Sequence, residues 1–242
     1  MLEPWEIRTD DNRKENSKRV FIIFCEDGAV EPAYFELFKN EDVHVAAYGN
    51  KKQHHAQVDY ATEYFRKNDL LEVVEVNGFA QEVLKLDEGA QAWCVFDRDK
   101  EPNDQKDTAF NDSISAANSK GIKTAWSNDD FELWILLHFE DVDPTNSDYF
   151  NRTKYYERLT EILKERFPSE TLFQNPKFDY YSSMKSKKKF LGYTYQLMKT
   201  SLSSAIERAR KLEEFHSVSP PKPNHLHCPC TKVHWLVAEL MS

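Results

Sequence analysis

Glycine is scarce in this sequence. The six glycines among 242 residues never lie within ten residues of one another. This spacing excludes a glycine-rich dinucleotide-binding turn, a Walker A loop and a GxSxG nucleophile elbow. A His-Glu-x-x-His pattern, which marks one class of zinc protease, does not occur either. Any chemistry must therefore come from carboxylates, from the eight histidines or from a partner.

Basic residues are too few to balance the acidic ones. The chain has 32 Lys and Arg against 41 Asp and Glu, which gives a formal net charge of −9. An acidic chain is a poor general binder of nucleic acid, because the phosphate backbone is repelled. Binding of that kind would need a local basic patch or a metal ion held among the acids.

Cysteines and long apolar runs are also few. Four cysteines in a chain of this length do not form the framework of a disulfide-rich secreted domain, and the N-terminus has no apolar signal segment. The most apolar stretch, 131–139, is interrupted by Glu132 and His138 and is far shorter than the ~20 residues that span a bilayer. With 40% hydrophobic and 30% charged residues, the chain is expected to be a soluble, cytoplasmic, globular protein without a membrane segment.

The chain divides into an alternating half and a helical half. Short buried strands are expected at 19–25, 43–48, 92–96 and 121–126, and helices at 31–38, 55–68, 107–119 and 131–139. The ambiguous stretch 69–88 is expected to be mostly helical. This alternation predicts an open, mostly parallel α/β sheet flanked by helices.

Apolar residues at helical spacing, such as Leu159 and Leu163, predict a mainly helical second half. We accordingly expect a flexible N-terminal segment at 1–18, an α/β core at 19–142 and a helical C-terminal region at 143–242. The proline-rich segment 219–223 is expected to be a stiff linker.

Two of the predicted strands end in carboxylates. Glu26 follows strand 19–25 directly, and Asp97 and Asp99 follow strand 92–96. In an open parallel sheet, functional side chains gather at the carboxyl ends of the strands. Residues i and i+2 of an extended chain point the same way, so Asp97 and Asp99 can face one point while Arg98 points elsewhere. Such carboxylates suit Mg²⁺, with Glu26 positioning or deprotonating an attacking water; the alternative is a turn that simply favours Asp.

Three ordered blocks carry a resemblance to a known family. They are Phe24-Cys25-Glu26-Asp27-Gly28 followed by Glu31-Pro32-Ala33-Tyr34-Phe35, then Trp93-Cys94-Val95-Phe96-Asp97-Arg98-Asp99, and then residues 127–139. Together with a weaker block at 230–237, they resemble the "CEG…TEPxYF", "SNPxFExWLLLHF" and "PST-V-LV" segments of the RloB family of restriction-linked and abortive-infection proteins. Asp27, Val30 and Asp129 depart from the family's usual Gly, Thr and Pro, and none of these departures removes a candidate ligand.

The resemblance implies a Toprim-like core, as in topoisomerases, primases and overcoming-lysogenization-defect nucleases. In that core a Glu after the first strand and an Asp-x-Asp after a later strand hold magnesium for phosphoryl transfer. By position these residues are Glu26, Asp97 and Asp99, with Glu26 also the general acid/base. The resemblance further implies an Mg²⁺-dependent endonuclease, with Mn²⁺ as a substitute, that acts in antiphage defence. Its implied substrate is nucleic acid, RNA such as tRNA before DNA, and its implied partner is an ATPase of the ABC or AAA type; a homodimer is left open.

Glu132 and His138 lie in the apolar stretch 131–139. Glu132 is interpreted either as a carboxylate that complements the helix dipole or as an outer metal or water ligand among the catalytic residues. His138 is expected to be a hydrogen-bonded core histidine.

The only dense basic run lies in the second half of the chain. It comprises Lys185, Lys187, Lys188 and Lys189, interleaved with aromatic residues. Basic and aromatic side chains together can grip phosphates and stack bases, so this run is the candidate nucleic-acid patch; the alternative is an ordinary solvated face.

Two readings remain open at this level. His225, His227, Cys228 and Cys230 could suggest zinc, but their spacing is cramped for a structural site and favours a loop. The rival to a nuclease is a non-catalytic regulatory subunit whose acids shape an interface with an ATPase.

Overall fold

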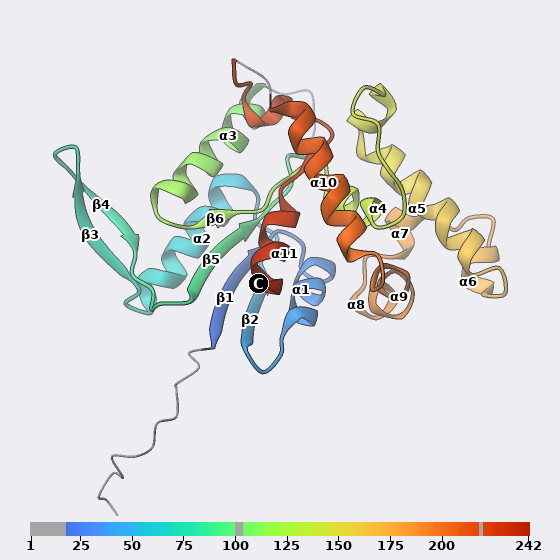
Figure 1. The fold of residues 1–242 in the computed structure, drawn as a ribbon, viewed down its shortest axis with the longest axis horizontal. Coiled ribbons are helices and arrows are strands. Elements are labelled where there is room, and N and C mark those ends of the chain that lie inside the picture. Colours follow the sequence, from blue (N-terminus) through green and yellow to red (C-terminus); the bar gives the residue numbers. More distant parts are fainter. Residues whose placement is uncertain (1–17, 100–103, 218–219) are drawn as a thin grey trace, which may run out of the picture.

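The computed structural model describes residues 18–99, 104–217 and 220–242 (Figure 1). Its centre is a four-stranded parallel sheet in the order β2-β1-β5-β6. These strands are β1 (Arg19–Cys25), β2 (Val43–Gly49), β5 (Ala90–Val95) and β6 (Lys123–Thr124). Two antiparallel pairs accompany the sheet, β3 (Leu71–Val76) with β4 (Phe79–Leu84) and β7 (Ser127–Asn128) with β8 (Cys230–Thr231). The predicted parallel α/β architecture is confirmed.

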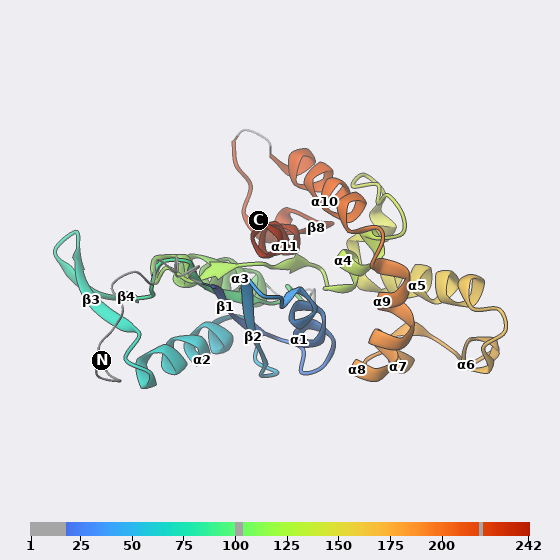
Figure 2. The same cartoon turned by 60° about the horizontal axis from the view of Figure 1, so that its bottom comes forward.

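Helices cover both faces of the sheet, and Figure 2 shows α2 and α11 on opposite sides of β1 and β2. One face packs against α2 (His54–Lys67) and α3 (Asp104–Ser119) and includes Phe24. The other face, which includes Phe21 and Ile23, packs against α1 (Val30–Phe35), α4 (Glu132–Leu137) and α11 (Val233–Met241). Because both faces of β1 are buried, its sequence reads as a continuous apolar run.

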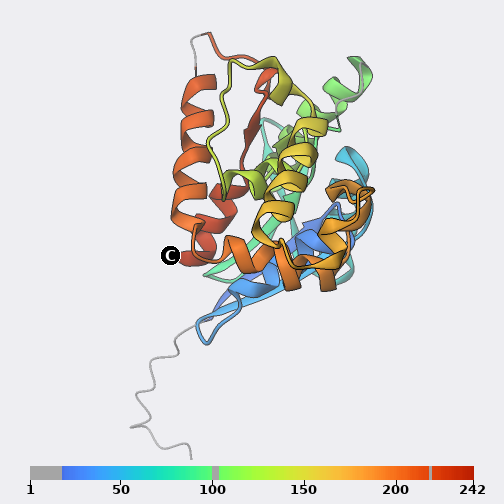
Figure 3. The same ribbon diagram turned by 90° about the vertical axis from the view of Figure 1, so that its right-hand side faces the viewer.

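The second half of the chain is helical, as predicted. Its elements are η2 (Ser147–Phe150), α5 (Arg152–Arg166), α6 (Thr171–Gln174), α7 (Tyr180–Ser183), α8 (Lys187–Lys189), the π-helical η3 (Phe190–Thr194), α9 (Tyr195–Met198), α10 (Leu202–His216) and η4 (Asn224–Leu226). In the first half, the short helix η1 (Glu36–Phe38) extends α1. Figure 3 shows α4 between α5 and α10, and all three contribute to the apolar core that covers the sheet. The core is therefore continuous across residue 142, and the division into two regions stays a prediction.

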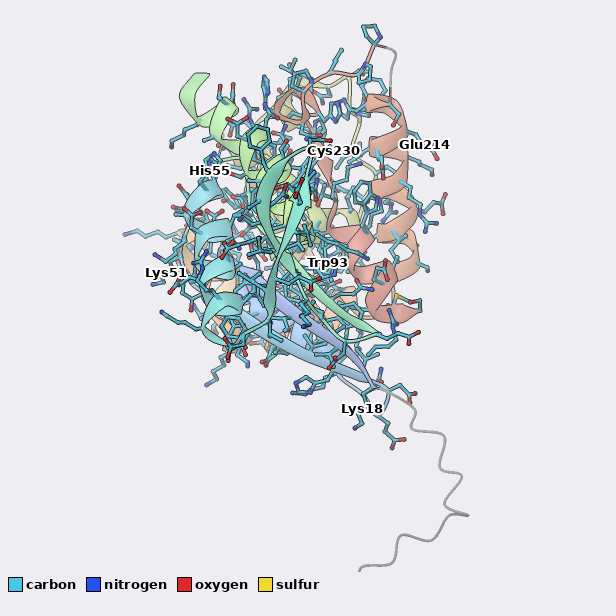
Figure 4. The ribbon with its side chains drawn as sticks, turned by 90° about the vertical axis from the view of Figure 1, so that its left-hand side faces the viewer. Lys18, Lys51, His55, Trp93, Glu214 and Cys230 are labelled. Atoms are coloured by element: carbon cyan, nitrogen blue, oxygen red, sulfur yellow. The ribbon has the colours of Figure 1, made fainter. Side chains whose placement is uncertain are left out.

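The stretch 69–88 corrects the sequence analysis, because it forms the β3–β4 hairpin rather than helix. Asn77 and Gly78, with φ of 52° and 83°, make the connecting turn. Positive φ at both positions is what a type I′ hairpin turn requires, so this Asn-Gly pair was the signal for strands. The hairpin projects from the body in Figure 1 and faces the viewer in Figure 4, and Phe79 near its tip is 77% exposed.

The other predicted elements differ from the structure mainly at their ends. The strand expected at 121–126 is limited to β6, and the helix expected at 131–139 is limited to α4. Residues 1–17 of the predicted flexible segment, the loop around Pro102 and the first residue of the predicted linker lie outside the described residues. Within the described ranges, no helix is long and apolar enough to cross a membrane.

Candidate active site

The site begins where β1 and β5 end side by side, with Cys25 paired to Val95. The Glu26 amide donates to the Val95 carbonyl at 3.0 Å. The Asp97 amide in turn donates to the Glu26 carboxylate at 3.2 Å. Two of the predicted acids are thus joined through the backbone at the carboxyl edge of the sheet.

Two further residues fix these strand ends. The buried side-chain amide of Gln57, on α2, donates to the carbonyls of Phe24 at 2.6 Å and Val95 at 2.8 Å. At the end of β2, a Cβ on Gly49 would lie 2.6 Å from both the Asp27 carbonyl oxygen and the Gly28 Cα. Only glycine therefore lets the turn after Glu26 pack against β2.

A cavity of about 690 Å³ opens at this edge; we call it the acidic cavity. Its charged lining residues are the acids Glu26, Asp27, Glu31, Asp97, Asp99, Asp130 and Glu132 and the bases Lys51, Lys52, Arg152 and Lys185. All four residues predicted to be catalytic line this one cavity. Of the four lysines in the predicted nucleic-acid patch, only Lys185 lines it.

Asp97 and Asp99 both reach the cavity, but the chain between them is not simply extended. Asp99 has a φ of 51°, and its carboxylate accepts hydrogen bonds from Gln53 and Arg152. Arg98 points elsewhere, as expected, and its Nε donates to Asp107 on α3 at 2.9 Å.

The helical second half of the chain supplies two cations to the cavity, one from the start of α5 and one from the segment between α7 and α8. Arg152, the first residue of α5, pairs with Asp99, with Asp129 at 2.8 Å and with Asp130 at 3.3 Å. Lys185 Nζ lies 3.0 Å from the Glu132 carboxylate. These pairs connect the helical region to the acids that the sheet and α4 position.

Crowding of carboxylates shifts their pKa values in opposite directions. Burial and the charge of Asp99 raise the pKa of Glu26 to about 8, against the opposing hydrogen bond from the Asp97 amide. Burial and the neighbouring charge of Asp130 also raise the pKa of Asp97 and of Glu132 well above the usual range. Burial opposes ionisation of Asp130 too, but a hydrogen bond with Glu132 and the charges of Lys185 and Arg152 lower its pKa.

The donor chemistry of the cavity fits a hard divalent cation. Its candidate ligands are carboxylate oxygens, and Asp97 Oδ1 is buried without a hydrogen-bond partner. As the side chains stand, no three His, Cys, Asp or Glu residues in the described ranges converge closely enough to form a metal site. Ligation by Asp99 would therefore require its carboxylate to leave Arg152.

His138 is a buried core histidine, as expected. Its Nδ1 lies 3.2 Å from the Met198 carbonyl, and burial lowers its pKa to about 4. It therefore lies outside the candidate chemistry.

The other lysines of the predicted patch lie outside the acidic cavity. Lys187 approaches Glu36 at 3.6 Å, Lys189 donates to the Ser183 carbonyl at 2.8 Å, and Lys188 is exposed. Their role in nucleic-acid binding stays a prediction.

The His and Cys group near the C-terminus has several separate partners. His225 Nδ1 lies 2.6 Å from Asn111 Nδ2, and His227 stacks on His216 with ring centroids 5.3 Å apart. Cys230 is buried in β8. These contacts connect the segment to α3 and α10 rather than bringing the four side chains together.

Several residues of the acidic cavity were not predicted from the sequence. Glu31 and Asp130 stand in the family-like blocks, but neither was assigned a role from the sequence. Gln53, Arg152 and Tyr156 had no signal, because they come from other segments and meet the acids only in the fold. The Tyr156 hydroxyl donates to the Asp130 carboxylate.

Comparison with known proteins gives one family. A family model described as RloB-like protein matches residues 21–240, a range that includes every candidate site residue. No curated protein and no solved structure was found to match the chain. The match extends over nearly the whole sequence, from β1 to α11, and the chain belongs to the RloB family.

Proposed function

We propose that this RloB-like protein is a Mg²⁺-dependent endonuclease with a Toprim-like core. The observation that carries the proposal is the convergence of Glu26, Asp97, Asp99 and Glu132 on one cavity at the carboxyl edge of a parallel sheet. Adjacent parallel strands that each end in acid are the arrangement that the family resemblance leads us to expect. Mn²⁺ is the proposed substitute metal.

Each acid has a proposed role. Asp97 and Asp99 would hold the metal, and Glu132 would be an outer ligand to it or to its water. The bound metal would polarise the phosphodiester and lower the pKa of a water nucleophile. Glu26, with its pKa raised to about 8, is suited to exchange a proton near neutral pH.

The two cations from the helical region have a complementary role. Arg152 and Lys185 face the acids across the cavity, where a phosphodiester would lie. Guanidinium and ammonium groups make charge-assisted hydrogen bonds to phosphate oxygens. They would orient the scissile phosphate and stabilise the charge that develops on it during cleavage.

Substrate, partner and biological role follow from the family resemblance. RNA such as tRNA is the proposed substrate, with DNA second, and abortive infection of phage-infected cells is the proposed outcome. The sequence has no glycine-rich nucleotide-binding loop. An ABC- or AAA-type ATPase is therefore the proposed partner that controls activity.

A non-catalytic regulatory subunit of an ATPase-based defence complex is the second candidate. The observation that favours it is the pairing of Asp99 and Asp130 with Arg152 and of Glu132 with Lys185. Ion pairs of this kind also serve to hold a helical region against a sheet, with no catalytic role for the acids.

The substitution Asp97→Ala separates the two candidates. If the site is catalytic, cleavage of nucleic acid and toxicity to the host cell should fall by at least about a hundredfold, while folding and ATPase binding persist. Asp59→Asn, an exposed acid on α2 outside the cavity, is the control and should behave as wild type. Toxicity that survives Asp97→Ala, or that disappears together with ATPase binding, would favour the regulatory subunit.

A further inference from the structure

A second cavity adjoins the acidic one. It has a volume of about 670 Å³ and shares Arg152, Tyr156 and Tyr181 with the acidic cavity. It lies over α5 and the start of α7, two helices that contact each other. A ligand centred on the acids can therefore extend past the two tyrosines into this second space.

A supported aromatic ring stands where the two cavities meet. Tyr181 is 57% exposed, and its ring centroid lies 5.0 Å from that of Tyr156 at an interplanar angle of 49°. Lys185 Nζ lies 5.3 Å from the Tyr181 centroid and 5.5 Å from the Tyr156 centroid. Tyr156 is itself held by its hydrogen bond to Asp130. Tyr181 thus presents an exposed ring, supported by the Tyr156 ring, beside the proposed reaction centre.

The charges of the two cavities suit different parts of a nucleotide. The acidic cavity is lined by seven acids and four bases, so a phosphate would bind there, beside Arg152 and Lys185, together with the proposed divalent metal that offsets the acids. The second cavity is lined by three carboxylates, those of Glu157, Glu161 and Asp179, but by only two cationic side chains. No metal is proposed there to offset these carboxylates for a phosphate, whereas a neutral planar base with amino groups would find hydrogen-bond acceptors and the aromatic face of Tyr181.

We propose that the second cavity is a nucleobase subsite that takes an unpaired base next to the scissile phosphate, stacked on Tyr181. The substrate class of the site is then single-stranded nucleic acid or an unpaired loop, since a base in a duplex must first be unpaired and unstacked before it can enter. This inference rests on the proposed nuclease function and specifies the substrate of the same site.

The test measures binding and cleavage separately. Fluorescence anisotropy, in Ca²⁺ in place of Mg²⁺, compares a labelled single-stranded RNA oligonucleotide with a duplex of the same sequence. Because base–aromatic stacking is lost with the ring, Tyr181→Ala should weaken single-strand binding by about tenfold. Tyr181→Phe should retain most of the affinity because it keeps the ring. Phe79→Ala removes an exposed aromatic from the distant β3–β4 hairpin and should bind as wild type (Figure 1).

The outcomes distinguish this inference from the proposed function. Single-strand binding that depends on Tyr181 supports the subsite, even if no strand is cleaved in Mg²⁺ and the nuclease proposal fails. Cleavage in Mg²⁺ with equal single-strand affinity for wild type and Tyr181→Ala would overturn the subsite and leave the nuclease standing. Equal losses of single-strand and duplex affinity in Tyr181→Ala would also overturn it, because a stacking site should not sense paired bases.

Discussion

The carboxylates of the acidic cavity differ in pKa although they lie close together. Asp130 has a lowered pKa beside Lys185 and Arg152, whereas burial and neighbouring acids raise the pKa of Glu26 and Glu132. The site thus combines groups able to hold a proton with groups that stay ionised. This separation of neighbouring acids is the usual basis for assigning acid and base roles.

Lys185 is the lysine of the basic run whose loss should affect turnover most. Its Nζ pairs with Glu132 at 3.0 Å, and the charge of Glu132 raises its pKa despite the desolvation that opposes it. Lys185→Gln should lower the cleavage rate at saturating substrate by about tenfold or more, because it removes a charge that faces the phosphate. Lys188→Gln is the matched control, and a rate loss as large as that of Lys185→Gln would contradict this assignment.

His138 should make the protein less stable in mild acid. Burial lowers its folded-state pKa to about 4, below the ordinary value of 6.5, so only the unfolded chain binds a proton between these values. Stability is therefore full above pH ~6.5 and is lost as the pH falls toward ~4, by about 2 kcal/mol at pH ~5. Urea unfolding should show that His138→Gln loses about that much less than wild type between pH ~7.5 and pH ~5. Equal losses in the two proteins would show that His138 does not contribute this pH dependence.

At the scale of elements, the close approach of three segments positions Glu26. The turn after β1, the end of β2 and α2 meet at Gly49 and Gln57. Gly49→Ala should destabilise the fold by about 1–3 kcal/mol, because the added Cβ forces the end of β2 away from the backbone of Asp27 and Gly28. Cleavage should fall further than stability explains, because the turn carries the Glu26 carboxylate. Thermal unfolding and initial rates are the measurements.

Gly192→Ala is the control for that substitution. A Cβ at Gly192 would meet nothing within 4 Å, so its stability should be unchanged or slightly higher. If Gly49→Ala behaves like Gly192→Ala in both measurements, Gly49 does not set the position of Glu26.

The sequence predicts elements well where burial alone determines them. Strand β1 was recognisable because both its faces are buried, and Glu26, Asp97 and Asp99 because they follow buried strands. The β3–β4 hairpin was missed because its exposed valines and glutamates do not show a clean alternation, although Asn77-Gly78 marks its turn. Arg152 could not be predicted, since its partners lie 22 to 53 residues away and meet it only through the packing of α5.

At the scale of the whole molecule, the excess of acidic residues is reflected in the acidic cavity at the edge of the sheet. The chain has a net charge of −9, and four of the five buried acids in the described ranges line one cavity together with cations from the helical region. Nucleic acid would approach such a surface only if bound cations neutralise the acids and lysines hold the strand elsewhere. A requirement for a divalent metal is therefore the central claim of the account.

The most direct test incubates the purified protein with total RNA and with plasmid DNA, alone and with the proposed partner ATPase. Since every proposed ligand is a carboxylate oxygen, cleavage should appear in Mg²⁺ or Mn²⁺, disappear in EDTA and persist with a zinc-selective chelator. Cleavage that continues in EDTA would contradict the site as described. Absence of cleavage of both nucleic acids in Mg²⁺, with the ATPase present, would contradict the nuclease itself.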